Sequence, residues 1–93
     1  MSSAASQNRP NQHDLQLRQR AVKVVPGGMT GHLNAAGLPA GYPQFCERGQ
    51  GCRVWDVDGN EYIDFMCSWG PNLLGHHHPV VDEAARRQQA LGD

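Results

Sequence analysis

Three adjacent histidines, His76, His77 and His78, are the residues of this chain whose type most directly suggests metal chemistry. Protein zinc sites usually have four ligands in a tetrahedral arrangement. Adjacent residues on an extended backbone point in alternating directions, so the triplet cannot converge on one ion as an i, i+4 pair on a helix can. The alternative is a histidine that hydrogen-bonds the backbone near a helix start. We therefore predict no metal site.

The segment Asp56-Val57-Asp58-Gly59-Asn60 begins like a calcium loop, in which oxygen ligands alternate along the chain. The glycine of such a loop would fall at Glu61 and its bidentate glutamate at Cys67, so two decisive positions fail. Asp-Gly between strand-like segments favours a hairpin turn instead, with both central residues at positive φ. We expect a turn here.

Two further groups of residues carry weaker chemical signals. Gly27-Gly28-Met29-Thr30-Gly31 offers backbone N–H groups to an anion, but it lacks the Gly-Lys-Ser/Thr ending of a phosphate-binding loop. Cys67 or Ser68 with a nearby histidine suggests a nucleophile and base, yet no oxyanion donor can be placed and a short strand end explains both side chains. The three cysteines form no Cys-x-x-Cys pair, which indicates reduced, semi-buried thiols.

The first half of the chain is expected to contain a tail, a helix and a long loop. Residues 1–12 are polar, so we predict a disordered tail there. Over residues 13–25 apolar side chains recur with helical spacing, and Pro26-Gly27-Gly28 ends the pattern. Residues 26–43 contain five glycines and three prolines. They predict an irregular loop that is either functional, in contact with other structure, or a flexible linker.

The second half predicts a small antiparallel sheet followed by a helix. Strands are expected at residues 44–47, 53–57 and 61–65, joined around Gly49-Gln50-Gly51 and Asp58-Gly59. Pro79 suits the first position of a helix, because its missing N–H would be unpaired there. Asp82 and Glu83 each precede an arginine by four residues, Arg86 and Arg87 respectively, which favours two ion pairs. The predicted fold class is α+β: helix, long loop, small antiparallel hairpin, helix.

Composition excludes several classes of partner. The formal charge is −1 and the basic residues are scattered, so no basic stripe for nucleic acid or an anionic membrane is expected. No apolar run suits a signal peptide or a membrane span, and a cytoplasmic location is expected. Hydrophobic residues make up 39% of the chain, and the mean hydropathy is −0.59. This composition suits a segment that wraps over a larger body.

Four motifs occur in order along the chain: Pro26-Gly27-Gly28, the run Gly-Cys-Arg-Val-Trp-Asp-Val-Asp-Gly-Asn-Glu-Tyr-Ile-Asp over residues 51–64, Ser68-Trp69-Gly70-Pro71, and Leu-Gly-His-His-His-Pro over residues 74–79. Together they resemble class-III aminotransferases, which depend on pyridoxal phosphate, and the first and third are most similar to glutamate-1-semialdehyde 2,1-aminomutase-like proteins. The resemblance implies that residues 13–93 are the truncated amino-terminal segment of a fold-type-I enzyme.

The resemblance also implies an activity for the parent enzyme. Such an enzyme, a homodimer in this family, moves an amino group between a small-molecule donor and acceptor, an amino acid or amino ketone. Family members hold pyridoxal phosphate on a lysine beyond the region seen here, and the only lysine of this chain, Lys23, falls in the first predicted helix. We therefore assign no catalytic or cofactor-binding residue, and we expect the segment alone to be inactive and to bind no cofactor.

By the same resemblance, Ser68 and Trp69 are substrate-binding residues, with Trp69 lining the pocket. A core role for Trp69 is equally compatible with its type, because aromatic side chains dominate cores as well. The ungapped equivalent of an arginine that suits a substrate carboxylate in the aminomutase is Asn34, whose neutral amide cannot supply a charged clamp. Transamination of another substrate could therefore replace the internal amino shift. A noncatalytic docking module that associates with a larger partner is the alternative.

Overall fold

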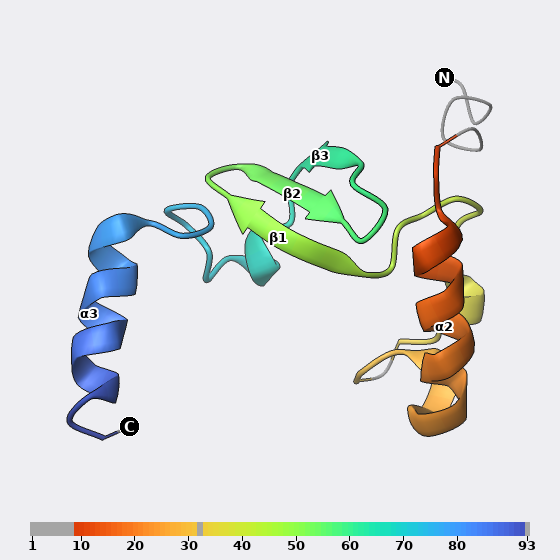
Figure 1. Cartoon of the computed structure of the whole chain (residues 1–93), viewed down its shortest axis with the longest axis horizontal. Coiled ribbons are helices and arrows are strands. Elements are labelled where there is room, and N and C mark those ends of the chain that lie inside the picture. Colours follow the sequence, from red (N-terminus) through yellow and green to blue (C-terminus); the bar gives the residue numbers. More distant parts are fainter. Residues whose placement is uncertain (1–8, 32, 93) are drawn as a thin grey trace.

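The computed structural model describes residues 9–31 and 33–92, with a helix at each end and a sheet between them (Figure 1). The regular elements are α2 (Gln12–Val24), β1 (Cys46–Gln50), β2 (Arg53–Asp56), β3 (Glu61–Ile63) and α3 (Pro79–Gln89). Three short 3₁₀ turns lie between them, η1 (Pro26–Gly28), η2 (Ala35–Gly37) and η3 (Cys67–Trp69). The predicted order of helix, long loop, antiparallel sheet and helix is confirmed.

The segment that leads into α2 contacts the sheet. Residues 1–8 of the predicted disordered tail lie outside the described residues. Arg9 stacks over the ring of Tyr62 at 5.1 Å, and the carbonyl of Pro10 accepts a hydrogen bond from Asn60 Nδ2 at 2.8 Å. The helix begins at Gln12, one residue before the predicted start.

The start of α2 is capped from a distant part of the chain. Asn11 occupies the N-cap position, but its side chain makes no capping hydrogen bond. The carboxylate of Asp58 accepts from the N–H groups of His13 at 2.8 Å and Asp14 at 3.0 Å instead. These are two of the four N–H groups that a helix start leaves without an internal partner. The loop between β2 and β3 therefore holds the helix against the sheet.

The sheet is antiparallel with the order β1-β2-β3. The first strand is displaced from its predicted position, because β1 runs over residues 46–50 and the turn falls at Gly51, whose φ is 57°. An irregularity in the register lies between Cys46 and Arg48. In the Asp58-Gly59 turn only Gly59 has positive φ, at 84°, so the prediction that both residues would adopt it is wrong.

Helix α3 begins at Pro79, as predicted, but only one of its two predicted ion pairs forms. Arg87 lies 3.9 Å from Glu83, the expected i, i+4 partner. Arg86 also contacts Glu83, and Asp82 pairs with His77 at 2.9 Å. The predicted Asp82–Arg86 pair is therefore wrong, because a histidine before the helix takes the carboxylate.

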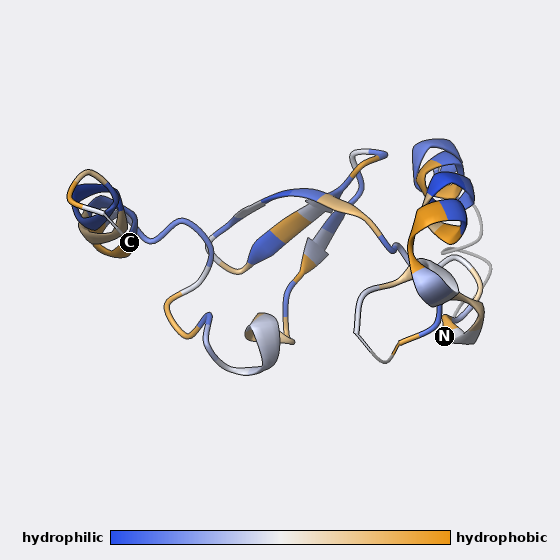
Figure 2. Cartoon of the chain, turned by 90° about the horizontal axis from the view of Figure 1, so that it is seen from below, coloured by the Kyte–Doolittle hydropathy of each residue, from blue (hydrophilic) through white to orange (hydrophobic). Residues whose placement is uncertain are grey.

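The described part of the chain has no hydrophobic core. None of its hydrophobic side chains is buried, whereas the carboxylates Asp14 and Asp56 are 3% and 2% exposed. The radius of gyration is 15.8 Å, against about 12 Å for a compact domain of this length. Figure 2 shows hydrophobic residues distributed along the helices, strands and loops. Polar contacts thus organise the fold, and its apolar surface is left uncovered. No described helix has the length and apolar character of a membrane span.

Candidate functional site

An open groove of about 760 Å³ lies beside the sheet. The long loop forms one wall through residues 39–43, and strand residues including Cys46, Val54 and Tyr62 contribute to its lining. The segment after β3 contributes Asp64, Phe65, Met66, Ser68 and His76, and Arg9 lies in the lining as well. The groove therefore brings together the predicted long loop, the sheet and one of the two predicted substrate-binding residues.

Ser68 and Trp69 lie in η3, a turn with unusual backbone geometry. Ser68 lines the groove, whereas Trp69 is outside its lining and 83% exposed. Cys67, Ser68 and Trp69 have φ angles of 52°, 53° and 65°. Left-handed geometry costs an L-residue roughly 1–2 kcal/mol, so three in succession store backbone strain. The prediction of a strand end here is wrong, because β3 ends at Ile63.

Asp64 and His76 face each other across the base of the loop that carries this turn. Asp64 Oδ2 lies 2.9 Å from His76 Nε2. Its other oxygen accepts from the N–H groups of Met66 at 2.9 Å and Cys67 at 3.1 Å. The Cys67 N–H and then the His76 ring lower the pKa of Asp64 from its ordinary value. The carboxylate is therefore ionised at neutral pH and acts as an acceptor.

The three adjacent histidines have different surroundings. His76 contacts Asp64, His77 Nδ1 lies 2.9 Å from Asp82, and His78 Nδ1 is buried without a hydrogen-bond partner. The extended backbone expected for the triplet is wrong at His77, whose φ is 55°. The partners of His76 and His77 are carboxylates, not the backbone groups that we expected. Within residues 9–31 and 33–92, no group of three or more histidine, cysteine or acidic residues is arranged around a common ion.

The predicted turn after β2 is confirmed and is organised around the buried Asp56 carboxylate. Oδ1 of Asp56 accepts from the N–H groups of Asp58 at 3.0 Å and Asn60 at 2.8 Å, and Oδ2 accepts from Tyr62 Oη at 2.9 Å. Burial alone would raise the pKa of Asp56, but hydrogen bonds, first from Asn60 and then from Tyr62 and Asp58, outweigh it and lower the pKa. Of the residues that resemble calcium ligands, Asp56 and Asp58 thus accept hydrogen bonds from neighbouring groups, and Asn60 donates them.

Asp14 is a structural residue that the sequence pattern did not reveal. Its Oδ1 accepts from the N–H groups of Gln44 at 2.9 Å and Phe45 at 2.8 Å, and its Oδ2 accepts from Arg18 Nε at 2.7 Å. These contacts join α2 to the chain just before β1. The only signal in the sequence was the i, i+4 spacing of Asp14 and Arg18, which is common on helices.

The cysteines are free thiols, and Cys46 is not an activated nucleophile. All three are free, and only Cys67 is half-buried, whereas Cys46 and Cys52 are exposed. The prediction of semi-buried thiols is therefore right for Cys67 alone. Local desolvation, followed by the nearby carboxylates of Asp56 and Asp14, raises the pKa of Cys46. A thiol with a raised pKa stays protonated and unreactive at neutral pH.

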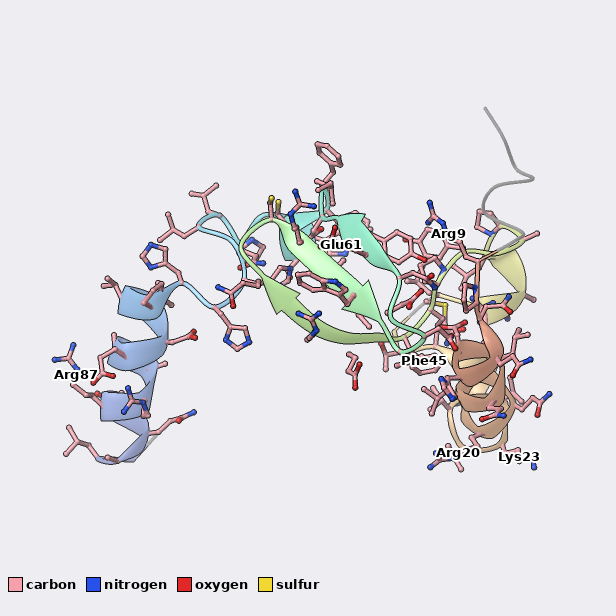
Figure 3. The ribbon with its side chains drawn as sticks, turned by 45° about the horizontal axis from the view of Figure 1, so that its top comes forward. Arg9, Arg20, Lys23, Phe45, Glu61 and Arg87 are labelled. Atoms are coloured by element: carbon pink, nitrogen blue, oxygen red, sulfur yellow. The ribbon has the colours of Figure 1, made fainter. Side chains whose placement is uncertain are left out.

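The described residues do not fit pyridoxal phosphate. The only lysine, Lys23, is exposed near the end of α2, and Figure 3 shows it beside Arg20 at the tip of the helix away from the sheet. Lys23 borders a shallow surface pocket. The pocket is lined by residues that include Leu17 and Val24, and no carboxylate is among them. Lys23 is also absent from the groove lining. Lys23 is therefore not placed to hold the cofactor within the part of the chain that the structure describes.

Asn34, the residue in the place of the expected arginine, has a local structural role. Its side-chain oxygen accepts from the N–H of Ala36 at 2.9 Å and caps η2. Its amide group also lies close to Gly27, where an added Cβ would be 3.4 Å from Nδ2. The side chain is thus committed to the long loop.

Comparisons with known proteins identify the family. The model of the family "Aminotransferase class-III" matches residues 38–92. An aminopentol aminotransferase from Sphingopyxis macrogoltabida is 51% identical over 77 residues, which cover 83% of this chain and 18% of that protein. A glutamate-1-semialdehyde 2,1-aminomutase from Chloroflexus aurantiacus is 54% identical over 72 residues, which cover 77% of this chain and 16% of that protein.

Solved structures agree with this relationship. The FumI protein of Sphingopyxis sp. MTA144, in its PLP internal aldimine form, has a TM-score of 0.77 and 49% identity, over 86% of this chain and 19% of that one. An omega-transaminase from Sphaerobacter thermophilus has a TM-score of 0.74 and 36% identity, over 89% of this chain and 18% of that one. The chain spans less than a fifth of the length of these relatives. It belongs to the class-III aminotransferase family of pyridoxal-phosphate-dependent enzymes.

Proposed function

We propose that this chain is the amino-terminal, substrate-facing arm of a longer enzyme that transfers an amino group on an amino acid or amino ketone. The match to the family over residues 38–92 carries the proposal, because it includes all of the groove lining except Arg9, together with the turn of Ser68 and Trp69. The uncovered apolar surface supports it as well, since such surface is normally buried against other structure.

The arm contributes to substrate binding, and the rest of the enzyme contributes the cofactor. When bound, pyridoxal phosphate supplies the electron sink for the reaction. Lys23 is too exposed and too poorly surrounded to hold it, and the arm alone therefore neither binds the cofactor nor transfers an amino group. In the enzyme, the Ser68 hydroxyl donates or accepts a hydrogen bond, and the Trp69 ring forms an apolar wall beside the substrate.

Transamination is the proposed reaction, in preference to an internal amino shift. Asn34 caps η2 and carries no charge, so it cannot clamp a substrate carboxylate as an arginine does. The 51% identity to a protein named as an aminopentol aminotransferase supports a donor whose recognition needs no such clamp. The enzyme is proposed to be a homodimer, with the arm near the subunit interface.

A noncatalytic docking module is the second candidate, and the same exposed apolar residues favour it. Phe65 is 90% exposed, Leu73 85% and Leu91 83%, all on segments outside the sheet. A short natural product that copurifies with a larger partner would support this candidate. A natural product that contains its own cofactor-binding lysine would contradict it.

A chimera tests the proposed function. The matching segment of the Sphingopyxis macrogoltabida aminopentol aminotransferase is replaced by that of this chain, and amino transfer is measured in the presence of pyridoxal phosphate. The proposal predicts an active chimera. Trp69→Ala and Ser68→Ala should each raise KM for the amino donor about tenfold, because each removes a side chain that binds the substrate. The matched control is Lys23→Ala, which should keep both activity and bound cofactor.

The control also makes the proposal refutable. If Lys23→Ala abolished cofactor binding, the cofactor lysine would lie in this segment. The proposal that the rest of the enzyme binds the cofactor would then be wrong. Unchanged kinetics in both Trp69→Ala and Ser68→Ala would show that the turn does not contact the substrate.

A further inference from the structure

The loop of residues 65–75 leaves the sheet after β3 and is closed at its base. Its ends meet through the Asp64 carboxylate and the His76 ring, 2.9 Å apart. The backbone closes it too, because the Gly51 N–H donates to His76 O at 2.9 Å and the His76 N–H donates to Gly51 O at 2.8 Å. Side chains and backbone thus fasten the loop to the β1–β2 turn at one point.

Asp64 also holds the beginning of the strained turn. One oxygen binds the N–H groups of Met66 and Cys67, and the other faces His76. Left-handed backbone at consecutive L-residues persists only where the surroundings impose it. A single carboxylate therefore connects the turn that carries Ser68 and Trp69 to His76, whose backbone pairs with that of Gly51.

The His76 ring has room only because residue 49 is glycine. A Cβ at position 49 would lie 2.6 Å from Cγ and 2.9 Å from Nδ1 of His76, closer than such contacts allow. Gly49 lies within β1 and is not among the glycines with positive φ, so its backbone geometry is open to other residues. A glycine inside a strand often marks the close approach of another group. Here that group is the imidazole.

We propose that Asp64 and His76 are positioning residues. Their contact, called the clasp below, closes the loop of residues 65–75 and thereby presents Ser68 and Trp69 to the substrate. Gly49 leaves the space that the imidazole occupies. The proposal rests on the proposed function, in which Ser68 and Trp69 contact the amino substrate. Asp64 and His76 act through the loop. Loss of the clasp therefore weakens substrate binding more than it slows turnover.

Four variants of the protein at its natural length test the clasp. His76→Ala removes the ring, and Gly49→Ala displaces it without altering any residue of the loop. His76→Gln is the conservative variant, because its side-chain amide can donate to Asp64 in place of Nε2. Gly37→Ala is the matched control, since an added Cβ there meets nothing within 4 Å and the backbone needs no positive φ.

Two readouts are taken from each variant. Fluorine NMR of protein labelled with 5-fluorotryptophan reports the surroundings of Trp69, whose signal is assigned by its loss in Trp69→Phe. Steady-state kinetics gives KM for the amino donor and kcat. We expect His76→Ala and Gly49→Ala to shift or broaden the Trp69 signal and to raise KM about tenfold, with kcat changed less than about twofold. His76→Gln and Gly37→Ala should behave as the wild type.

Each readout can overturn the proposal. An unchanged Trp69 signal in both His76→Ala and Gly49→Ala would show that no clasp exists. A changed signal with unchanged KM would overturn the positioning role. Failure of the proposed function has a different signature: the wild type and Gly37→Ala would transfer no amino group. That result would overturn the positioning role as well, while the fluorine spectra still decide whether the clasp exists.

Discussion

Asp58→Ala should loosen the start of α2, although residue 58 lies more than forty positions along the chain from His13 and Asp14. The substitution removes both acceptors for the N–H groups of His13 and Asp14, and Asn11 offers no substitute. The turn itself keeps its hydrogen bond, because the donor to Asp56 is the backbone N–H of residue 58. The effect should therefore be confined to the junction between the turn and the helix.

The expected magnitude follows from two contributions that the substitution removes. Loss of an N-cap acceptor costs about 0.5–2 kcal/mol, and removal of a negative charge at a helix start costs about 0.3–1 kcal/mol. Solvent screens the Asp58 side chain little, since it is only 4% exposed. The sum of about 1–3 kcal/mol corresponds to roughly 5- to 150-fold more frequent opening of the helix start.

Hydrogen exchange measured by mass spectrometry on the natural-length protein reports how often the start of α2 opens. Peptides from Gln12–Val24 should exchange faster in Asp58→Ala by that factor, while peptides from Pro79–Gln89 serve as an internal control. Asp58→Asn keeps one acceptor oxygen and should show a smaller effect. Unchanged exchange over Gln12–Val24 in Asp58→Ala would refute the capping role of Asp58.

Three further predictions follow from the other buried carboxylates and the histidines. Asp14→Ala leaves the N–H groups of Gln44 and Phe45 unpaired and should lower the free energy of unfolding by about 2–4 kcal/mol in a denaturant titration; a loss below about 0.5 kcal/mol would contradict the anchoring role. The folded-state pKa of Asp56 is lowered, so its stabilisation is complete above about pH 4 and is lost as the pH falls through the folded pKa. Asp56→Asn should reduce this loss of unfolding free energy at acid pH, and the part that is due to Asp64 should remain. A pH dependence identical to that of the wild type would refute the assignment of the loss to Asp56. Zinc titration by calorimetry should show no affinity tighter than that of a free His-His-His peptide, because His76 and His77 face different carboxylates; tighter binding would contradict this.

The helices and the turn after β2 could be predicted because their signals are local. Pro26-Gly27-Gly28 ends α2 close to where the pattern indicated, and Pro79 begins α3. The Asp58-Gly59 turn follows from the need for positive φ at Gly59. In each case the residues that determine the structure lie within a few positions of it.

The misplaced features depend on contacts between residues far apart in the sequence. Gly49 was expected in a turn, but it lies in β1, and the His76 ring occupies the space that a side chain at this position would need. Nothing near Asp58 shows that it caps a helix at His13. The left-handed turn at Ser68 contains three L-residues with no intrinsic preference for that geometry, so contacts with other groups, those of Asp64 among them, must impose it.

Ser68 illustrates what the resemblance added to the local pattern. Composition and spacing gave it no chemical role, and a hydrolase-like nucleophile could not be built around it. The resemblance predicted a substrate-facing residue, and the structure places Ser68 in the lining of the groove. Its role in binding stays a prediction, and so does that of Trp69, which is exposed beside the groove.

We propose that this segment belongs to a longer enzyme that carries pyridoxal phosphate elsewhere. The most direct test is the intact mass of the natural product, measured before and after borohydride reduction, which fixes the cofactor to its lysine. We expect a protein several-fold heavier than 10.2 kDa, with the cofactor on a lysine other than Lys23. A product of 10.2 kDa without cofactor, or cofactor fixed on Lys23, would contradict it.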